Sequence, residues 1–209
     1  METREYGPKS APIVLIEPIG DHDSEGIEAE YNLIRRYTDK EFRLVTVKVD
    51  DWNRDLSPWK APAVFGREDF GDGAEAFFRK ILPLCEDSSK TYVIGGYSLA
   101  GLFALWAACR TDVFCGVAAA SPSAWFPGFL QYMREQGMKG RAVYLSLGDR
   151  EEKTRNQVMA TVGERIREMH GLLTEQEGVT CTLEWNPGNH FQEPDVRTAK
   201  AFARVMEAL

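Results

Sequence analysis

The sequence of 209 residues contains no apolar run of 18 residues, so no membrane-spanning helix is expected. Its first residues carry charges of both signs and lack the apolar core of a secretory signal. Four cysteines are present but no Cys-x-x-Cys pair, and each lies in an apolar segment: Cys85, Cys109, Cys115 and Cys181. These features are typical of buried thiols in a reducing compartment, so we expect a cytoplasmic protein that does not contact a membrane.

Positive charge and histidine are also scarce. The chain has 25 basic and 32 acidic residues, and this net charge of -7 argues against nucleic acid as the main partner. It has three histidines, His22, His170 and His190. His22 stands between two aspartates, but no matching group of His, Cys or Asp occurs elsewhere, so we expect no metal site.

What the sequence does contain is a regular alternation of strand and helix patterns, with no repeat and no linker. Strands alternating with helices of ten residues or more indicate an α/β fold, with a mostly parallel sheet covered by helices on both faces. We therefore interpret residues 1–209 as a single domain. The expected strands are 11–17, 42–52, 90–96, 113–121, 141–149 and 179–187, and the expected helices are 25–38, 73–83, 98–109, 154–176 and 193–209.

Polar residues follow the ends of these strands, which is where parallel sheets carry their sites. Ser98 follows the third strand, an acidic cluster at Asp149 follows the fifth, and His190 follows the last. Serine, acid and histidine in this order along the chain are typical of hydrolases with a nucleophile elbow. A serine hydroxyl becomes a nucleophile when an imidazole takes its proton and a carboxylate orients that imidazole.

The turn around Ser98 has the small neighbours that an exposed nucleophile needs. The segment reads Gly96-Tyr97-Ser98-Leu99-Ala100, with alanine at the position of the second glycine in the usual G-x-S-x-G pattern. The simpler alternative is that Ser98 only caps the following helix. If Ser98 is the nucleophile, the amide of Leu99 is one expected oxyanion donor, and the amide of Gly20 or Ile19 is the other.

Several motifs in order resemble a known group of proteins. "GGYSLAG", "ASPSAWFPG", "LSLGDREE", "RDLSPW" and "PGNHF" together are similar to the α/β-hydrolases that include esterase D and the enterochelin esterases. The resemblance implies an α/β-hydrolase fold without a large lid domain, in which Ser98 is the nucleophile and His190 the base. It also favours Glu151 as the acid of the triad, with Asp149 as the first alternative and Glu152 as the second.

Large aromatic residues in the loops at the strand ends are candidates for the walls of a substrate pocket. Trp52, Trp125 and Phe191 would be exposed there unless they line a pocket or pack against the loops. His22 lies in a loop at the same edge, where it either contacts substrate or is an ordinary polar loop residue.

The sequence as a whole favours a serine esterase. The predicted reaction is the hydrolysis of a small carboxylic ester through an acyl-enzyme, without a cofactor. The alternatives are an acyltransferase and a binding protein that uses the same fold without catalysis, because a fold does not determine a function. The sequence leaves the natural ester and the oligomeric state open.

Overall fold

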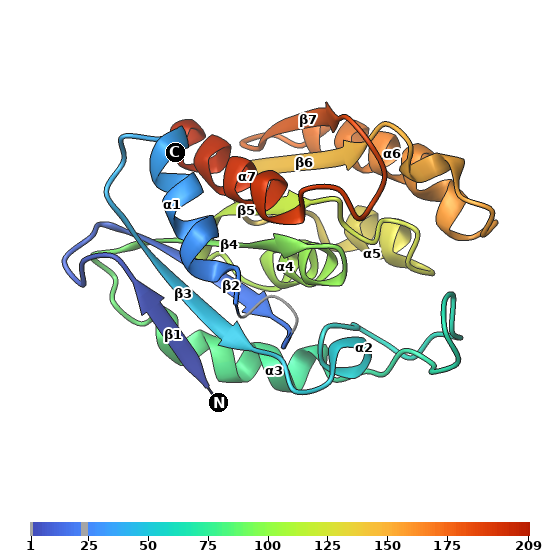
Figure 1. Ribbon diagram of the computed structural model, residues 1–209, viewed down its shortest axis with the longest axis horizontal. Coiled ribbons are helices and arrows are strands. Elements are labelled where there is room, and N and C mark those ends of the chain that lie inside the picture. Colours follow the sequence, from blue (N-terminus) through green and yellow to red (C-terminus); the bar gives the residue numbers. More distant parts are fainter. Residues whose placement is uncertain (1, 22–24) are drawn as a thin grey trace.

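The computed structural model describes residues 2–21 and 25–209 (Figure 1). Seven strands form one sheet in the spatial order β1-β3-β2-β4-β5-β6-β7. All neighbouring strands are parallel except β1, which pairs antiparallel with β3 at one edge. The strands are β1 (Thr3–Tyr6), β2 (Ile13–Ile19), β3 (Phe42–Lys48), β4 (Thr91–Tyr97), β5 (Phe114–Ala120), β6 (Ala142–Gly148) and β7 (Thr180–Asn186).

Helices cover both faces of the sheet, as the sequence predicted. One face packs against α1 (Ile27–Tyr37) and α7 (Pro194–Ala208), and Figure 1 shows these two helices lying together over the strands. The other face packs against α3 (Ala74–Ile81), α4 (Leu99–Arg110), α5 (Phe129–Gln136) and α6 (Val162–Glu175). The residues of β4 alternate between the two cores, with Val93 in one and Ile94 in the other.

The central helix α4 follows directly from the strand β4. Its residues from Leu99 to Cys109 are all buried, so α4 has no polar face and is enclosed by the sheet and its neighbours. The strand β4 lies in the middle of the sheet between β2 and β5. The turn that joins β4 to α4 is therefore fixed by buried structure on both sides.

Three elements were not predicted, and two were predicted too long. The strand expected over 42–52 ends at Lys48, four residues early. The edge strand β1, the single turn α2 (Trp52–Asp55) and the helix α5 were not among the expected elements, and Trp52 had been assigned to the end of the strand 42–52. The helix expected over 154–176 begins only at Val162, because the segment before it forms two short 3-10 turns, η2 (Glu151–Lys153) and η3 (Met159–Thr161). A further short turn, η1 (Leu82–Cys85), continues α3.

Candidate active site

Ser98 stands at a sharp turn between β4 and α4. Its backbone has φ of 56° and ψ of -117°, a conformation that residues with a side chain rarely adopt. The turn is held because the Ser98 amide donates to the Ala120 carbonyl at 3.1 Å, and the Ser123 amide donates to the Ser98 carbonyl at 3.0 Å. The Ser98 side chain makes no capping hydrogen bond to α4, so it is available for another contact.

The small residues around Ser98 are required by close packing. A Cβ atom added to Gly96 would lie 2.7 Å from the Cβ of Ala100, and the φ of Gly96 is +154°. A Cβ added to Gly101 would lie 3.0 Å from the Gly96 carbonyl oxygen. Alanine therefore fits at position 100 because glycine is at position 96, and the departure from G-x-S-x-G leaves the turn intact.

The side chains of Ser98, His190 and Glu151 form a continuous hydrogen-bonded relay. His190 Nε2 lies 3.0 Å from Ser98 Oγ, and His190 Nδ1 lies 2.7 Å from Glu151 Oε2. An ionised carboxylate can only accept, so Nδ1 carries the proton and Nε2 is left as the acceptor for the serine hydroxyl. This is the arrangement in which an imidazole can take a proton from a serine.

Glu151 is buried, and its charge is balanced by several donors. Its Oε1 accepts hydrogen bonds from the Gly148 amide and the Ser121 hydroxyl, each at 2.8 Å. Burial by itself would raise the pKa of this carboxyl, but the hydrogen bond from His190, the electrostatic interaction with that ring and these other donors outweigh it and lower the pKa below its ordinary value. Glu151 is therefore ionised and oriented toward His190.

Arg197 on α7 is a further partner of this carboxylate that the sequence analysis missed. Its side chain is 3% exposed, and the guanidinium donates to Glu151 Oε1 at 3.0 Å and to the Pro187 carbonyl at 2.9 Å. It also donates to the Tyr97 hydroxyl, which in turn donates to the His190 carbonyl at 2.7 Å. The sequence did contain a signal for this partner: Arg197 lies one helical turn before the buried Ala201, so it is a single arginine on the apolar face of α7.

The two alternative acids have other contacts. Asp149 accepts a hydrogen bond from the Gly188 amide at 2.8 Å, which fixes the loop that follows β7. Glu152 forms an ion pair with Arg167 of α6 at 3.0 Å. Of the three acids considered from the sequence, Glu151 is thus the one whose side chain meets His190.

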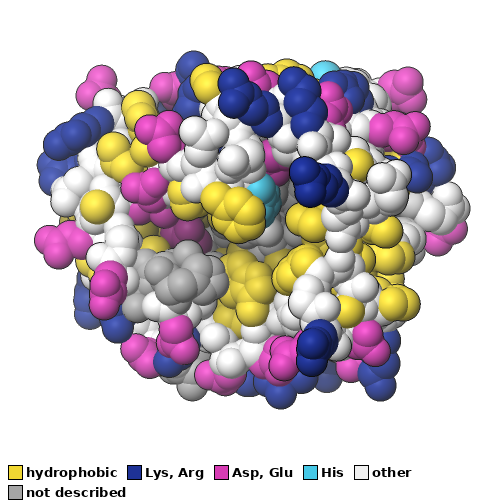
Figure 2. All heavy atoms as spheres, turned by 45° about the vertical axis from the view of Figure 1, so that its right-hand side comes forward, with side chains coloured by type: hydrophobic (Ala, Val, Ile, Leu, Met, Phe, Trp, Pro, Cys, Tyr) yellow, Lys and Arg dark blue, Asp and Glu magenta, His cyan; other side chains and the backbone are white. Residues whose placement is uncertain are grey.

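A cleft of about 260 Å³ opens beside the relay. Figure 2 shows it as a hollow in the surface, with a histidine side chain next to hydrophobic side chains and a basic side chain nearby. Its wall combines apolar and charged side chains with His190 itself. The lining residues are Pro122, Trp125, Arg150, Glu151, Lys153, Thr154, Met159, Val162, Asn189, His190 and Phe191.

The aromatic residues expected to line a pocket have different positions. Trp125 and Phe191 both line the cleft; Trp125 is nearly buried against Phe70, whereas Phe191 is 86% exposed. Trp52 begins α2 and packs against the core from the side, and it is not among the residues that line the cleft. His22 lies outside the described residues.

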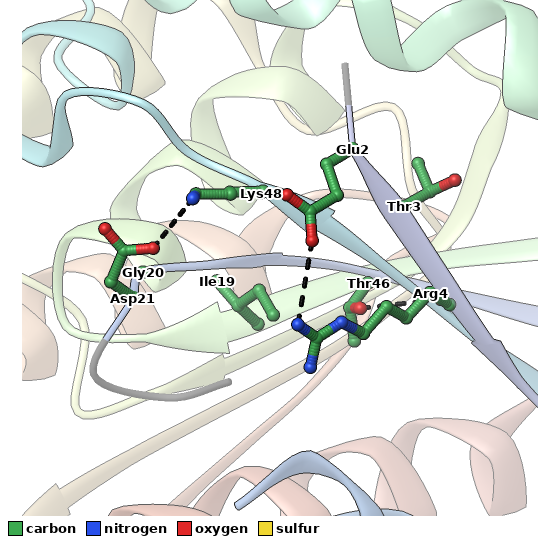
Figure 3. Close-up of a pocket in the computed structure, with 8 residues that line it drawn as sticks. All are labelled: Glu2, Thr3, Arg4, Ile19, Gly20, Asp21, Thr46 and Lys48. Atoms are coloured by element: carbon green, nitrogen blue, oxygen red, sulfur yellow. Dashed lines mark hydrogen bonds and ion pairs between the residues drawn. The ribbon is translucent and has the colours of Figure 1, made fainter. Parts of the chain in front are cut away.

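The expected oxyanion donors lie beyond the carboxyl ends of the strands, as Ser98 does. Leu99 is the first residue of α4, so its amide has no acceptor within the helix. Ile19 ends β2, the neighbour of β4, and Ile19 and Gly20 also line a small cavity of about 40 Å³ beneath β1. Lys48 Nζ lies 2.9 Å from Asp21 Oδ1 at this cavity, an ion pair between partly exposed side chains that Figure 3 marks.

Two general findings concern the described parts of the chain. Within residues 2–21 and 25–209, no three His, Cys, Asp or Glu side chains are grouped closely enough to hold a metal ion. In the same residues, no helix combines the length and apolar character that a bilayer-spanning segment needs.

Comparisons with solved structures identify the fold. The chain is similar to an IroE-like serine hydrolase from Shewanella oneidensis, with a TM-score of 0.76 and 16% identity over 97% of this chain and 74% of that one. It is also similar to the siderophore hydrolase EstB from Aspergillus nidulans (TM-score 0.68, 16% identity, 92% of this chain and 81% of that one). A third similar structure is Est1E from Butyrivibrio proteoclasticus (TM-score 0.57, 12% identity, 99% of this chain and 92% of that one).

These similarities and the sheet topology together show that the chain has the α/β-hydrolase fold. The fold predicted from the sequence motifs is thereby confirmed, including the absence of a large lid domain within the described residues. No protein-family model matches the chain, and the search of curated proteins also found no match. At 12–16% identity the neighbours establish the architecture, and the chemistry has to be argued from the site.

Proposed function

We propose that this chain is a serine esterase that hydrolyses a small carboxylic ester. The observation that carries this proposal is the relay from Ser98 through His190 to Glu151, with contacts of 3.0 Å and 2.7 Å. The solved structures with the same fold include proteins named as a serine hydrolase and as esterases, which supports the same class of reaction. We also propose, from the sequence predictions, that residues 1–209 act as one cytoplasmic domain without a cofactor.

The proposed reaction begins when His190 takes the proton of Ser98 and the serine oxygen attacks the ester carbonyl. The negative charge that develops on the carbonyl oxygen is stabilised by the amide of Leu99 and by an amide at Ile19 or Gly20. His190 then gives the proton to the leaving alcohol, and an acyl group remains on Ser98. Water activated by His190 releases the acid and restores the serine.

Hydrolysis is favoured over acyl transfer because the relay is open to water. The His190 side chain is 24% exposed, and Phe191 beside it projects from the surface. Exclusion of water favours acyl transfer, because water hydrolyses an acyl-enzyme. The open cleft next to His190 instead supports deacylation by water.

The test is labelling with a fluorophosphonate, followed by the intact mass of the protein. We expect one adduct on the wild type, because an activated serine displaces fluoride from the phosphorus, and no adduct on Ser98→Ala. Ser123→Ala is the matched control, since its hydroxyl lies only 3.4 Å from Ser98 Oγ but makes no contact with His190; it should keep the adduct. An unlabelled wild type, or a labelled Ser98→Ala, would refute the assignment.

A further inference from the structure

Two basic side chains line the cleft without a counter-charge. Arg150 and Lys153 both belong to the wall that includes His190, and both are exposed. Among the described residues, neither of these side chains has a carboxylate within ion-pair distance. In a protein whose net charge is -7, a pair of uncompensated cations beside the relay is a local reversal of the overall charge.

The acids of the same segment are all engaged elsewhere, as described above. Asp149 accepts from the Gly188 amide, Glu151 faces His190 and Arg197, and Glu152 pairs with Arg167 on α6. Glu152 fits there because residue 163, at the start of α6, is a glycine whose missing side chain leaves room for the carboxylate. Arg150 and Lys153 of this segment therefore line the cleft without an acid partner, whereas Glu151, the one acid of the segment that also lines it, is already paired with His190 and Arg197.

Much of the remaining cleft wall is apolar, although Thr154 and Asn189 also line it. Trp125, Met159, Val162 and Phe191 contribute large hydrophobic side chains to it. A volume of about 260 Å³ is just below the range of pockets that hold drug-sized ligands. The occupant that matches this wall is a small molecule with an apolar body and one negatively charged group, such as a carboxylate or a phosphate.

The position of His190 indicates which part of an ester lies in the cleft. The proton that Nε2 takes from Ser98 must pass to the oxygen of the leaving alcohol, so this oxygen lies on the His190 side of the serine. His190 and its neighbours Asn189 and Phe191 form part of the cleft wall. The alcohol portion of the ester is therefore the part directed into the cleft.

We propose that the natural ester carries a negatively charged group on its alcohol portion, and that Arg150 and Lys153 bind this group. This inference rests on the esterase function proposed above. An arginine matches the geometry of a carboxylate or phosphate with two parallel hydrogen bonds, and a lysine adds a point charge. An exposed pair of this kind contributes up to about a fivefold effect on binding.

The test compares 3-carboxyphenyl acetate with 3-carbamoylphenyl acetate, which have the same shape but differ in charge. The measured quantity is the ratio of their kcat/KM values, because the intrinsic reactivities cancel when this ratio is compared between variants. We expect the ratio to fall by up to about fivefold in Arg150→Gln and, separately, by up to about fivefold in Lys153→Gln. Arg155→Gln is the matched control, since Arg155 is an exposed arginine of the same segment that does not line the cleft; its ratio should equal that of the wild type.

Three other results would overturn the proposal, and they can be told apart. If both esters are hydrolysed and the ratio is the same in all variants, the anion site is wrong but the esterase function stands. If Arg150→Gln and Lys153→Gln instead lower the kcat/KM ratio of phenyl hydrogen succinate to phenyl succinamate, the charged group of the substrate lies on the acyl side. If neither ester is hydrolysed and fluorophosphonate leaves Ser98 unlabelled, the esterase function fails and the anion site fails with it.

Discussion

Replacement of Arg197 by methionine tests the role of the buried charge network behind the relay. Methionine keeps an unbranched apolar side chain but removes the guanidinium, and with it the donors to Glu151, Tyr97 and Pro187. Glu151 would keep the Gly148 amide and the Ser121 hydroxyl. Its charge would then be buried without the guanidinium that pairs with Oε1, so we expect losses in both stability and turnover.

The size of the loss follows from the burial of the pair. Side chains of Arg197 and Glu151 are 3% and 5% exposed, so solvent screens their interaction very little. Removal of one partner from a buried pair costs about 3 to 5 kcal/mol of unfolding free energy. For a chain of this size, that loss corresponds to a decrease in Tm of roughly 6 to 20 °C.

Unfolding by urea is monitored through the fluorescence of the five tryptophans. In a separate assay, kcat is measured for a neutral ester whose leaving alcohol is not activated. Because Arg197→Met can lose stability through packing alone, the double variant with Glu151→Gln is needed as well. If the cost comes from the uncompensated charge, the double variant will be at least about 1 kcal/mol more stable than the sum of the single losses predicts. Arg197→Lys should recover part of kcat. A loss below about 1 kcal/mol, or strict additivity, would refute the reasoning.

Three further predictions concern the relay itself. Ser98→Gly should be more stable to urea than Ser98→Ala by about 1 kcal/mol, because glycine adopts φ of 56° without strain; equal stabilities would contradict this strain. Glu151→Gln should lower kcat more than Asp149→Asn, because Glu151 is the acid that contacts His190; the reverse ranking would give the role of the acid to Asp149. Finally, the pKa of Glu151 is lowered in the folded state from its ordinary value of 4.5, so its ionised form stabilises the fold above that pH, and this stabilisation is lost as the pH falls through the lower folded value. The unfolding free energy of the wild type should therefore fall more steeply below pH 4.5 than that of Glu151→Gln, and parallel curves would be the contrary result.

The sheet could be predicted, and so could the positions of Ser98 and His190 beyond the carboxyl ends of its strands, because the sequence signals for both are local. Apolar runs mark the buried strands, and small residues mark the turn before α4. The strand β1 lacks such a signal, since its residues Thr3–Tyr6 are mostly exposed and polar. The helix α5 begins after Gly128, whose φ is +78°. It is too short to produce a long periodic pattern in the sequence.

Side-chain partners that are distant in the chain could not be read from the sequence. Arg197 and Glu151 are separated by 46 residues, and nothing in either local segment indicates that they meet. The early part of the helix expected over 154–176 was wrong for a similar reason. Asn156 donates to the Val64 carbonyl and its side-chain oxygen accepts from Val158 and Met159, so a distant loop and a local turn replace the helical hydrogen bonds there.

The segment 154–161 between η2 and α6 offers a route for changing specificity. It supplies Thr154 and Met159 to the wall of the cleft, but it contributes no strand to the sheet and none of the three relay side chains. The relay groups are instead attached to the ends of β4, β6 and β7, which the buried core holds in register. Exchange of this one segment, by natural divergence or by loop grafting, can therefore reshape the space for the alcohol portion while the relay keeps its geometry.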